Sequence, residues 1–116
     1  MKLKAILLLV SILLPISLFA ANIESGKTKF QTTCSPCHGP EGLGDGPTAA
    51  ALPEAMKPRN LQTGAMKVAT DDAKFKELIK KGGPAFGLNP LMAPQGSILT
   101  DTEIDDIIAY VNSIRK

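Results

Sequence analysis

Apolar residues recur at helical spacing in three segments of the chain. In the clearest of these, isoleucine and valine return every three or four residues: Ile104, Ile107, Ile108, Val111 and Ile114. Thr100 and Glu103 precede that run in the positions of a capping box, in which each side chain bonds the backbone amide of the other residue. The pattern predicts a helix that begins after Thr100 and ends at about residue 114.

Two earlier segments show the same period. Residues 71–81 begin with two aspartates, end with two lysines, and carry an apolar stripe: Phe75, Leu78 and Ile79. In residues 22–33 the stripe continues into the segment that follows: Ile23, Gly26, Phe30, Cys34 and Cys37. No segment alternates between apolar and polar positions as a strand would. The chain is therefore predicted to be all-α, with three main helices.

Long loops rich in glycine and proline join these helices. The loop between the first two runs from residue 39 to residue 69, with a short helical turn predicted somewhere in residues 48–56. A loop of this length is uncommon inside a small domain unless it has a function. A large apolar cofactor would explain it, because loop residues can pack on the cofactor instead of on each other.

The first twenty residues differ from the rest. Lys2 and Lys4 precede a short apolar run, and small residues follow around Ala20, which is the layout of a secretory signal peptide. We predict a signal peptide in 1–20 and one domain in 21–116. An uncleaved membrane anchor is the alternative, although the run is short and Pro15 interrupts it.

The predicted domain is electrically balanced. All eleven acidic residues lie beyond residue 20, whereas two of the thirteen lysines and arginines lie before it. The basic pI of about 8.6 therefore comes partly from the signal segment. We expect no nucleic-acid partner, because no basic excess remains to attract one.

The run Cys34-Ser35-Pro36-Cys37-His38 carries the strongest chemical signal. It reads C-x-x-C-H, the attachment pattern of a covalent c-type haem. The two thiols add to the vinyl groups of the porphyrin, and the adjacent histidine supplies an axial nitrogen to the iron. One covalent haem c is therefore the predicted cofactor, held by Cys34, Cys37 and His38.

Other uses of these residues fit the sequence less well. A disulfide between Cys34 and Cys37 would close a very small loop and stabilise little. A structural zinc site needs four ligands, and only three good ones are present. Redox chemistry of the thioredoxin type would call for a βαβ pattern near the cysteines. Haem attachment is the interpretation that accounts for all three residues.

Three stretches together resemble the class I c-type cytochromes, and the resemblance spans residues 21–116. They are Gly26-x-x-x-Phe30-x-x-x-Cys34-x-x-Cys37-His38, the segment from His38 to Pro47, and Asn89-Pro90-Leu91-Met92-Ala93-Pro94 with the helix after it. The resemblance implies the small cytochrome c fold, in which long loops wrap one haem and the terminal helices cross. One departure is Ala93, since family members often carry proline directly after the ligand methionine.

The resemblance also implies a role for individual residues. His38 and Met92 would be the two axial ligands, and the carbonyl of Pro47 would accept the second ring N–H of His38. Because His38 is the single histidine, a second histidine ligand from the same chain is excluded. Met56, Met66, a lysine or an open position remain alternatives to Met92.

Two further groups have an open role. Arg59 and Asn60 are candidates for hydrogen bonds to a haem propionate, or they are ordinary polar loop residues. The lysines of the second predicted helix form either a docking rim for an acidic partner or a solvated face: Lys74, Lys76, Lys80 and Lys81.

These observations lead to a functional prediction. We expect a periplasmic, monomeric carrier of single electrons that meets redox partner proteins in transient contacts, is not an enzyme, and has no stable membrane insertion. The alternatives are a catalytic or ligand-sensing haem protein with a displaceable sixth ligand, and a haem subunit of a larger periplasmic oxidoreductase.

Overall fold

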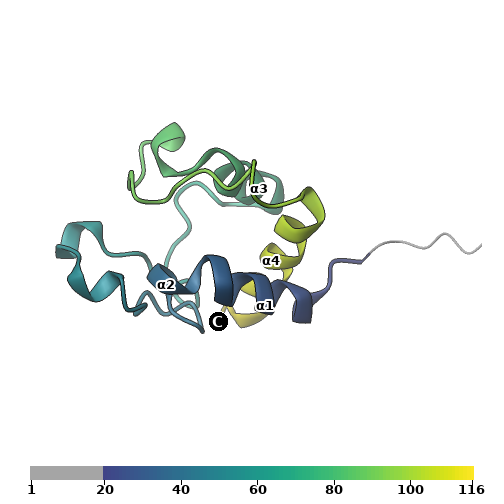
Figure 1. The fold of residues 1–116 in the computed structure, drawn as a ribbon, viewed down its shortest axis with the longest axis horizontal. Helices are drawn as coiled ribbons and strands as arrows, with labels where there is room; N and C mark the ends of the chain where they lie inside the picture. Colours follow the sequence, from purple (N-terminus) through teal and green to yellow (C-terminus); the bar gives the residue numbers. More distant parts are fainter. Residues whose placement is uncertain (1–19) are drawn as a thin grey trace, which may run out of the picture.

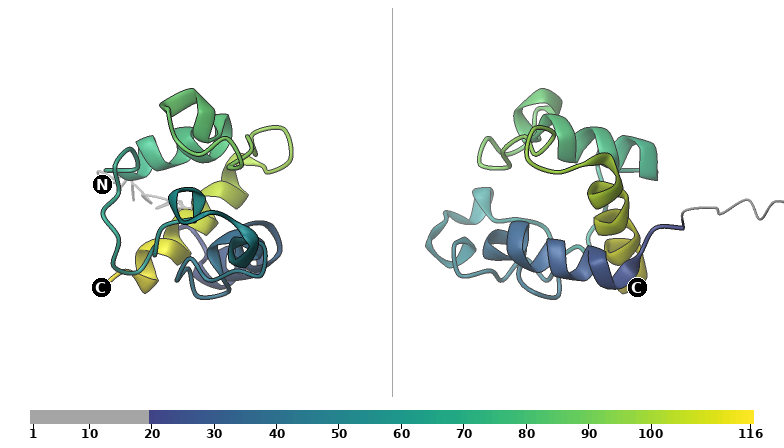
Figure 2. Two further views of the ribbon diagram at one scale, coloured as in Figure 1. Left: turned by 90° about the vertical axis from the view of Figure 1, so that its left-hand side faces the viewer. Right: turned by 45° about the vertical axis from the view of Figure 1, so that its right-hand side comes forward.

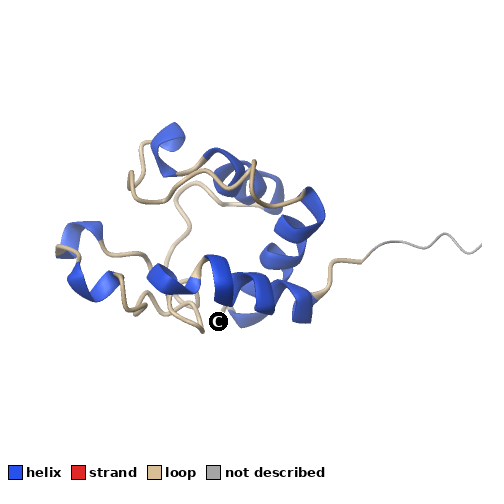
Figure 3. Ribbon diagram, in the orientation of Figure 1, coloured by secondary structure: helices blue, strands red, loops and turns tan. Residues whose placement is uncertain are grey.

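The computed structural model describes residues 20–116, so the predicted signal peptide lies outside it except for Ala20. The described part is helical and contains no strand (Figure 3). Its elements are α1 (Ile23–Thr33), α2 (Ser35–His38), η1 (Ala49–Ala51), η2 (Glu54–Met56), α3 (Asp72–Lys81), η3 (Gly83–Phe86) and α4 (Asp101–Ile114), where η marks a 3₁₀ helix. Among these helices, none is long and apolar enough to cross a membrane.

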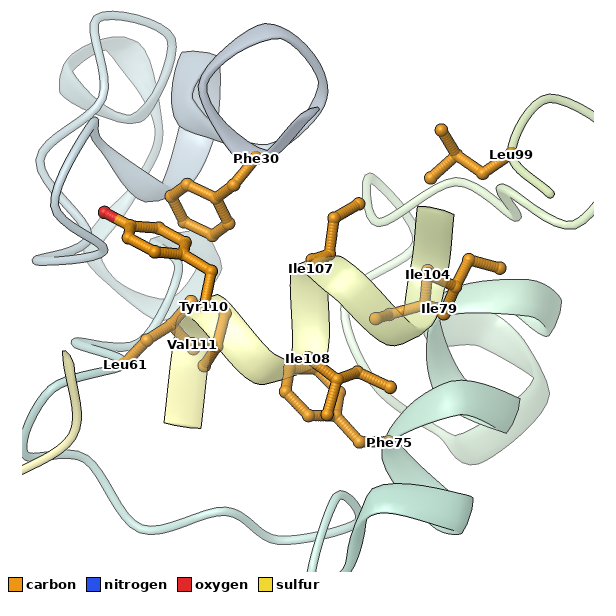
Figure 4. Close-up of a cluster of buried hydrophobic side chains, with 10 residues drawn as sticks. All are labelled: Phe30, Leu61, Phe75, Ile79, Leu99, Ile104, Ile107, Ile108, Tyr110 and Val111. Atoms are coloured by element: carbon orange, nitrogen blue, oxygen red, sulfur yellow. The ribbon is translucent and has the colours of Figure 1, made fainter. Parts of the chain in front are cut away.

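The helix α4 organises the hydrophobic core. Both bonds of the predicted capping box are formed: Glu103 N donates to Thr100 Oγ1 at 3.2 Å, and Thr100 N donates to Glu103 Oε1 at 3.1 Å. The predicted stripe is buried along almost the whole helix, and Figure 4 shows it between Phe30 on one side and Phe75 on the other. The core therefore joins three helices through α4.

The molecule has two layers that α4 connects (Figures 1 and 2). The first layer holds α1, α2 and the loop with η1 and η2; the second holds α3, η3 and the loop that leads into α4. Among the described elements, α1 and α2 make no direct helix contact with α3 or η3, whereas α4 contacts both α1 and α3. The layers meet at α4, and away from it no described helix of one layer packs on a helix of the other.

The predicted helices are confirmed to within a residue or two. Asn22 caps α1 by accepting a hydrogen bond from Ser25 N at 3.0 Å, and Asp71 caps α3 by accepting from Lys74 N at 2.8 Å. The turn predicted within residues 48–56 is present as η1 and η2. Cys34 ends α1, and α2 begins a separate turn that continues to His38.

Candidate functional site

The C-x-x-C-H run forms one compact turn at the end of α1. Cys34 N donates to the carbonyl of Phe30 at 2.8 Å and closes α1, while the carbonyl of Cys34 accepts from His38 N at 2.9 Å. Pro36 lies in the first turn of α2, where its missing N–H costs no helical hydrogen bond. Both cysteines and His38 are thus held on a single turn of backbone.

The glycine-rich segment after His38 caps this turn. The carbonyls of Ser35, Pro36, Cys37 and His38 would otherwise lack partners, as carbonyls do at the end of any helix. Each accepts a hydrogen bond from a following amide, at distances of 2.8–3.1 Å: Gly39, Thr48, Gly46 and Gly44, in that order. Gly46 lies so close to the backbone of α2 that a Cβ at this position would overlap the carbonyl oxygen of Pro36. The loop therefore fixes the turn through its backbone.

The two cysteines belong to one turn, and the thiol of Cys34 is partly buried. Both cysteines are free, and Cys34 packs against the hydrophobic core. Burial, with a contribution from Cys37, raises the pKa of Cys34 to about 12. At neutral pH the thiol of Cys34 is therefore protonated.

His38 presents a neutral imidazole. Burial lowers the pKa of this ring, and the neighbouring backbone of Arg59 opposes that shift only in part. The ring of Phe30 lies beside it, with 6.5 Å between ring centroids. A neutral imidazole has a free lone pair, which is the form that binds a metal ion.

The hydrogen bond predicted between His38 and Pro47 is absent from the structure. His38 Nδ1 is buried and has no hydrogen-bond partner. The turn around Pro47 is instead anchored on α2, through the bonds of Gly46 and Thr48 to Cys37 and Pro36. Pro47 itself is exposed beside α2, and its predicted contact with haem remains a prediction.

Arg59 and Asn60 form hydrogen bonds within their own loop. Asn60 Oδ1 accepts hydrogen bonds from Gln62 N at 2.9 Å and Thr63 N at 3.3 Å, and so builds a turn. Arg59 donates from Nη1 to the carbonyl of Ala65 at 3.2 Å and is exposed. Propionate contacts from these two residues stay a prediction.

Met92 lies in the second layer, in a loop that is fastened to the end of α3. The carbonyl of Met92 accepts from Gly83 N at 2.8 Å, and Met92 N donates to the carbonyl of Asn89 at 3.1 Å. Further along the loop, Gln95 N and Gly96 N donate to the carbonyls of Ile79 and Lys80, at 2.9 and 3.1 Å. The loop thereby satisfies the last carbonyls of α3, and this backbone pairing holds it in place although Ala93 replaces the usual proline.

The other methionines have different surroundings. Met66 packs against the hydrophobic core, as a gap-filling methionine does. Met56 ends η2 in the first layer and is half-buried. Of the three, Met92 is the one that bonds to η3 in the second layer and lies outside the core cluster.

The lysines of α3 are paired with acidic side chains. Lys76 Nζ lies 2.9 Å from Asp105 Oδ1, and Lys80 Nζ lies 3.1 Å from Asp101 Oδ1, so both link α3 to α4. Lys81 pairs with Glu77 at 2.7 Å, and Lys74 lies 3.9 Å from Asp71. This arrangement favours the solvated face over a docking rim, because the charges are already partnered.

Sequence reasoning missed the long-range contacts of two side chains, Asn89 and Arg115. Asn89 Nδ2 donates to the carbonyl of Met56 at 2.6 Å and connects the two layers. Arg115 donates from Nη1 to the carbonyl of Leu61 at 2.8 Å and from Nη2 to that of Gly64 at 3.1 Å. All three bonds end on backbone carbonyls far away in the sequence, and these leave no residue pattern to detect.

The described residues fit a flat, covalently attached cofactor. The thiols and the neutral imidazole lie on one turn of the first layer, and the Met92 loop lies on the second. The helices α1 and α2 do not pack on α3 or η3, so a plate-like group can lie between these elements. This donor set of two thiols, an imidazole and a thioether suits haem attachment and iron ligation.

Comparison with known proteins also indicates covalent haem attachment. The family described as "Cytochrome c" matches residues 23–115. Cytochrome c-554(547) of Halothiobacillus neapolitanus is 25% identical over 100 residues, which are 83% of this chain and 100% of that protein.

Solved structures are also similar. The cytochrome cL structures from Methylophaga aminisulfidivorans and Hyphomicrobium denitrificans are 27% and 25% identical, with TM-scores of 0.61 and 0.60, and cover 80% and 84% of this chain. A chain of a Kuenenia stuttgartiensis reducing HAO-like protein complex is 28% identical, with a TM-score of 0.64 over 81% of this chain. The chain spans about half the length of these three solved chains: 53%, 49% and 43%.

Proposed function

Because the chain belongs to the cytochrome c family, we propose that it is an exported monohaem electron carrier whose haem iron is held between His38 and Met92. Cys34 and Cys37 are the pair that attaches haem c covalently. A bound haem supplies an iron that alternates between the ferrous and ferric states and so carries one electron. One observation carries the ligand assignment: the Met92 loop is fastened in the layer opposite the C-x-x-C-H turn.

The proposed ligands both suit a carrier. Burial keeps the imidazole of His38 neutral, and the thioether of Met92 is neutral as well. A neutral thioether and a buried site favour the ferrous state, because neither compensates the extra positive charge of ferric iron. The backbone bonds at Gly83, Gln95 and Gly96 hold the methionine loop, so little rearrangement should accompany a change of charge.

We propose that partner proteins make small, transient contacts with this carrier. Interfaces of electron-transfer proteins lie at the low end of the size range. The signal-peptide pattern in residues 1–20 supports export to the periplasm, and the mass of the exported protein would identify the cleavage point.

Substitution of Met92 tests the ligand assignment. Ferric haem with a thioether ligand has a near-infrared charge-transfer band, and Met92→Ala should abolish this band, lower the reduction potential and let the ferrous protein bind carbon monoxide. Met56→Leu and Met66→Leu keep similar volume and are the matched controls, in which the band should persist. If Met92→Ala keeps the band, Met92 is not the ligand; if the wild type lacks it and binds carbon monoxide readily, the sixth position is open.

A stable subunit of a larger oxidoreductase is the second candidate. It is supported by the similarity to a chain that belongs to a complex. Gel filtration of the natively expressed protein separates the two: a free carrier elutes at the mass of one chain, whereas a subunit co-elutes with its partner.

A further inference from the structure

The side chain of Asn89 connects the two layers at the end away from α4. Its Nδ2 donates to the carbonyl of Met56 at 2.6 Å, across 33 residues of sequence. Its Oδ1 accepts from Leu91 N at 2.8 Å and shapes the turn that leads into Met92. Figure 1 shows the two loops approaching each other at the left-hand edge of the view. One side chain thus both shapes the methionine loop and ties it to the opposite layer.

The hydrogen bond between Asn89 and the carbonyl of Met56 can affect the position of Met92. Asn89 also accepts a backbone bond from Met92 N at 3.1 Å, so the two residues belong to one turn. The bond to Met56 is half-buried, where a lost hydrogen bond is replaced only in part by water. The flanking residues Pro90 and Leu91 are exposed and make no large packing contribution, since Leu91 is 53% exposed.

We propose that Asn89 is a positioning residue, whose bond to the carbonyl of Met56 holds the methionine loop closed and keeps the Met92 sulfur on the iron against competing ligands. This inference rests on the proposed function, since it takes Met92 as the sixth ligand. In this role Asn89 is not itself a ligand of the iron. It acts through Met92.

Asn89→Asp isolates the cross-layer bond. The carboxylate keeps an acceptor for Leu91 N but has no donor for the carbonyl of Met56, which it instead repels. Asn89→Ala removes both bonds. Gln95→Ala is the matched control, because Gln95 lies in the same loop and donates an amide bond to the carbonyl of Ala93 at 3.0 Å without crossing to the other layer.

The experiment is a titration of the ferric holoprotein with imidazole, which competes with the thioether for iron. The apparent affinity for imidazole should rise about threefold to tenfold in Asn89→Asp, as expected for the loss of one partly buried hydrogen bond. Asn89→Ala should show at least the same increase, and Gln95→Ala should match the wild type. The near-infrared band should disappear in step with imidazole binding.

A double-mutant cycle tests the route of the effect. In a Met92→Ala background the loop no longer competes for the iron, so adding Asn89→Asp should leave the imidazole affinity unchanged. A general loss of structure would instead affect both backgrounds, and circular dichroism melts of the holoproteins would reveal it.

The failures of the two proposals are distinguishable. If the wild type shows the band and Met92→Ala abolishes it, but Asn89→Asp behaves like Gln95→Ala, the positioning role is overturned and the proposed ligand stands. An equal effect of Asn89→Asp in both backgrounds also overturns it. If the wild type has no band, the proposed ligand and the role of Asn89 fall together.

Discussion

Replacement of Gly26 by alanine sets two physical effects against each other. Gly26 lies inside α1, where alanine is favoured over glycine by about 0.5–1 kcal/mol. At this position, however, a Cβ would overlap the carbonyl oxygen of Asp106 on α4. Helix propensity alone predicts a more stable protein, whereas the close approach of the two helices predicts a less stable one.

The structure indicates which effect is larger. The overlapping atom is backbone and cannot rotate away, so α1 and α4 must separate. That movement would loosen three fully buried side chains of α1 and α4: Phe30, Ile107 and Val111, each 1% exposed. Overpacking of a core costs about 1–3 kcal/mol, and a backbone obstacle belongs at the upper end. After the gain in propensity is subtracted, the net loss is about 2 kcal/mol.

Thermal unfolding of the holoprotein measures this loss. For a domain of this size, about 2 kcal/mol lowers Tm by roughly 8–16 °C. Gly87→Ala shows the other way in which a glycine can be required: nothing lies within 4 Å of its Cβ position, so its cost of about 1–2 kcal/mol comes from local strain at a φ of +68° alone. A Gly26→Ala protein that melts at or above the wild-type temperature would refute the close-packing argument.

Two further predictions concern hydrogen bonds and charge. Tyr110→Phe removes the bond from the hydroxyl to the carbonyl of Pro40 at 3.1 Å but keeps the packing on Phe30, so denaturant unfolding should show a loss of about 1 kcal/mol; a loss several times larger would mean that packing had changed. The bond to Lys80, with Lys76 nearby, lowers the pKa of Asp101. Its stabilising contribution is therefore present above the ordinary carboxyl pKa of 3.8 and is lost as pH falls through the lower folded value. Denaturant melts of wild type and Asp101→Asn should converge at the acid end, and a difference that persists there would contradict this assignment.

Local chemistry made much of the fold predictable from the sequence. The capping box at Thr100 and the aspartates at the start of α3 act over three or four residues, and the structure contains the bonds that they imply. The C-x-x-C-H run was equally readable, because its residues are adjacent and each has a distinct chemical role.

Contacts between distant segments were not predictable in this way. Asn89 and Arg115 bond to backbone carbonyls 33 to 54 residues away, and every residue offers a carbonyl. Likewise, the lysine stripe of α3 reads as an open basic face until α4 brings Asp101 and Asp105 against it. The structure supplies the partner in each case, since only the fold determines which segments meet.

The fastening of the methionine loop to α3 also bears on how the molecule opens. Because Gln95 and Gly96 use the last carbonyls of α3, the loop and the end of that helix should exchange their amide hydrogens as one cooperative unit. The C-x-x-C-H turn belongs to another unit, built on α1 and its crossing with α4. A bond from Met92 to iron would then link two units that can open separately. The strength of that bond would determine how often the methionine loop, with the end of α3, separates from the C-x-x-C-H turn.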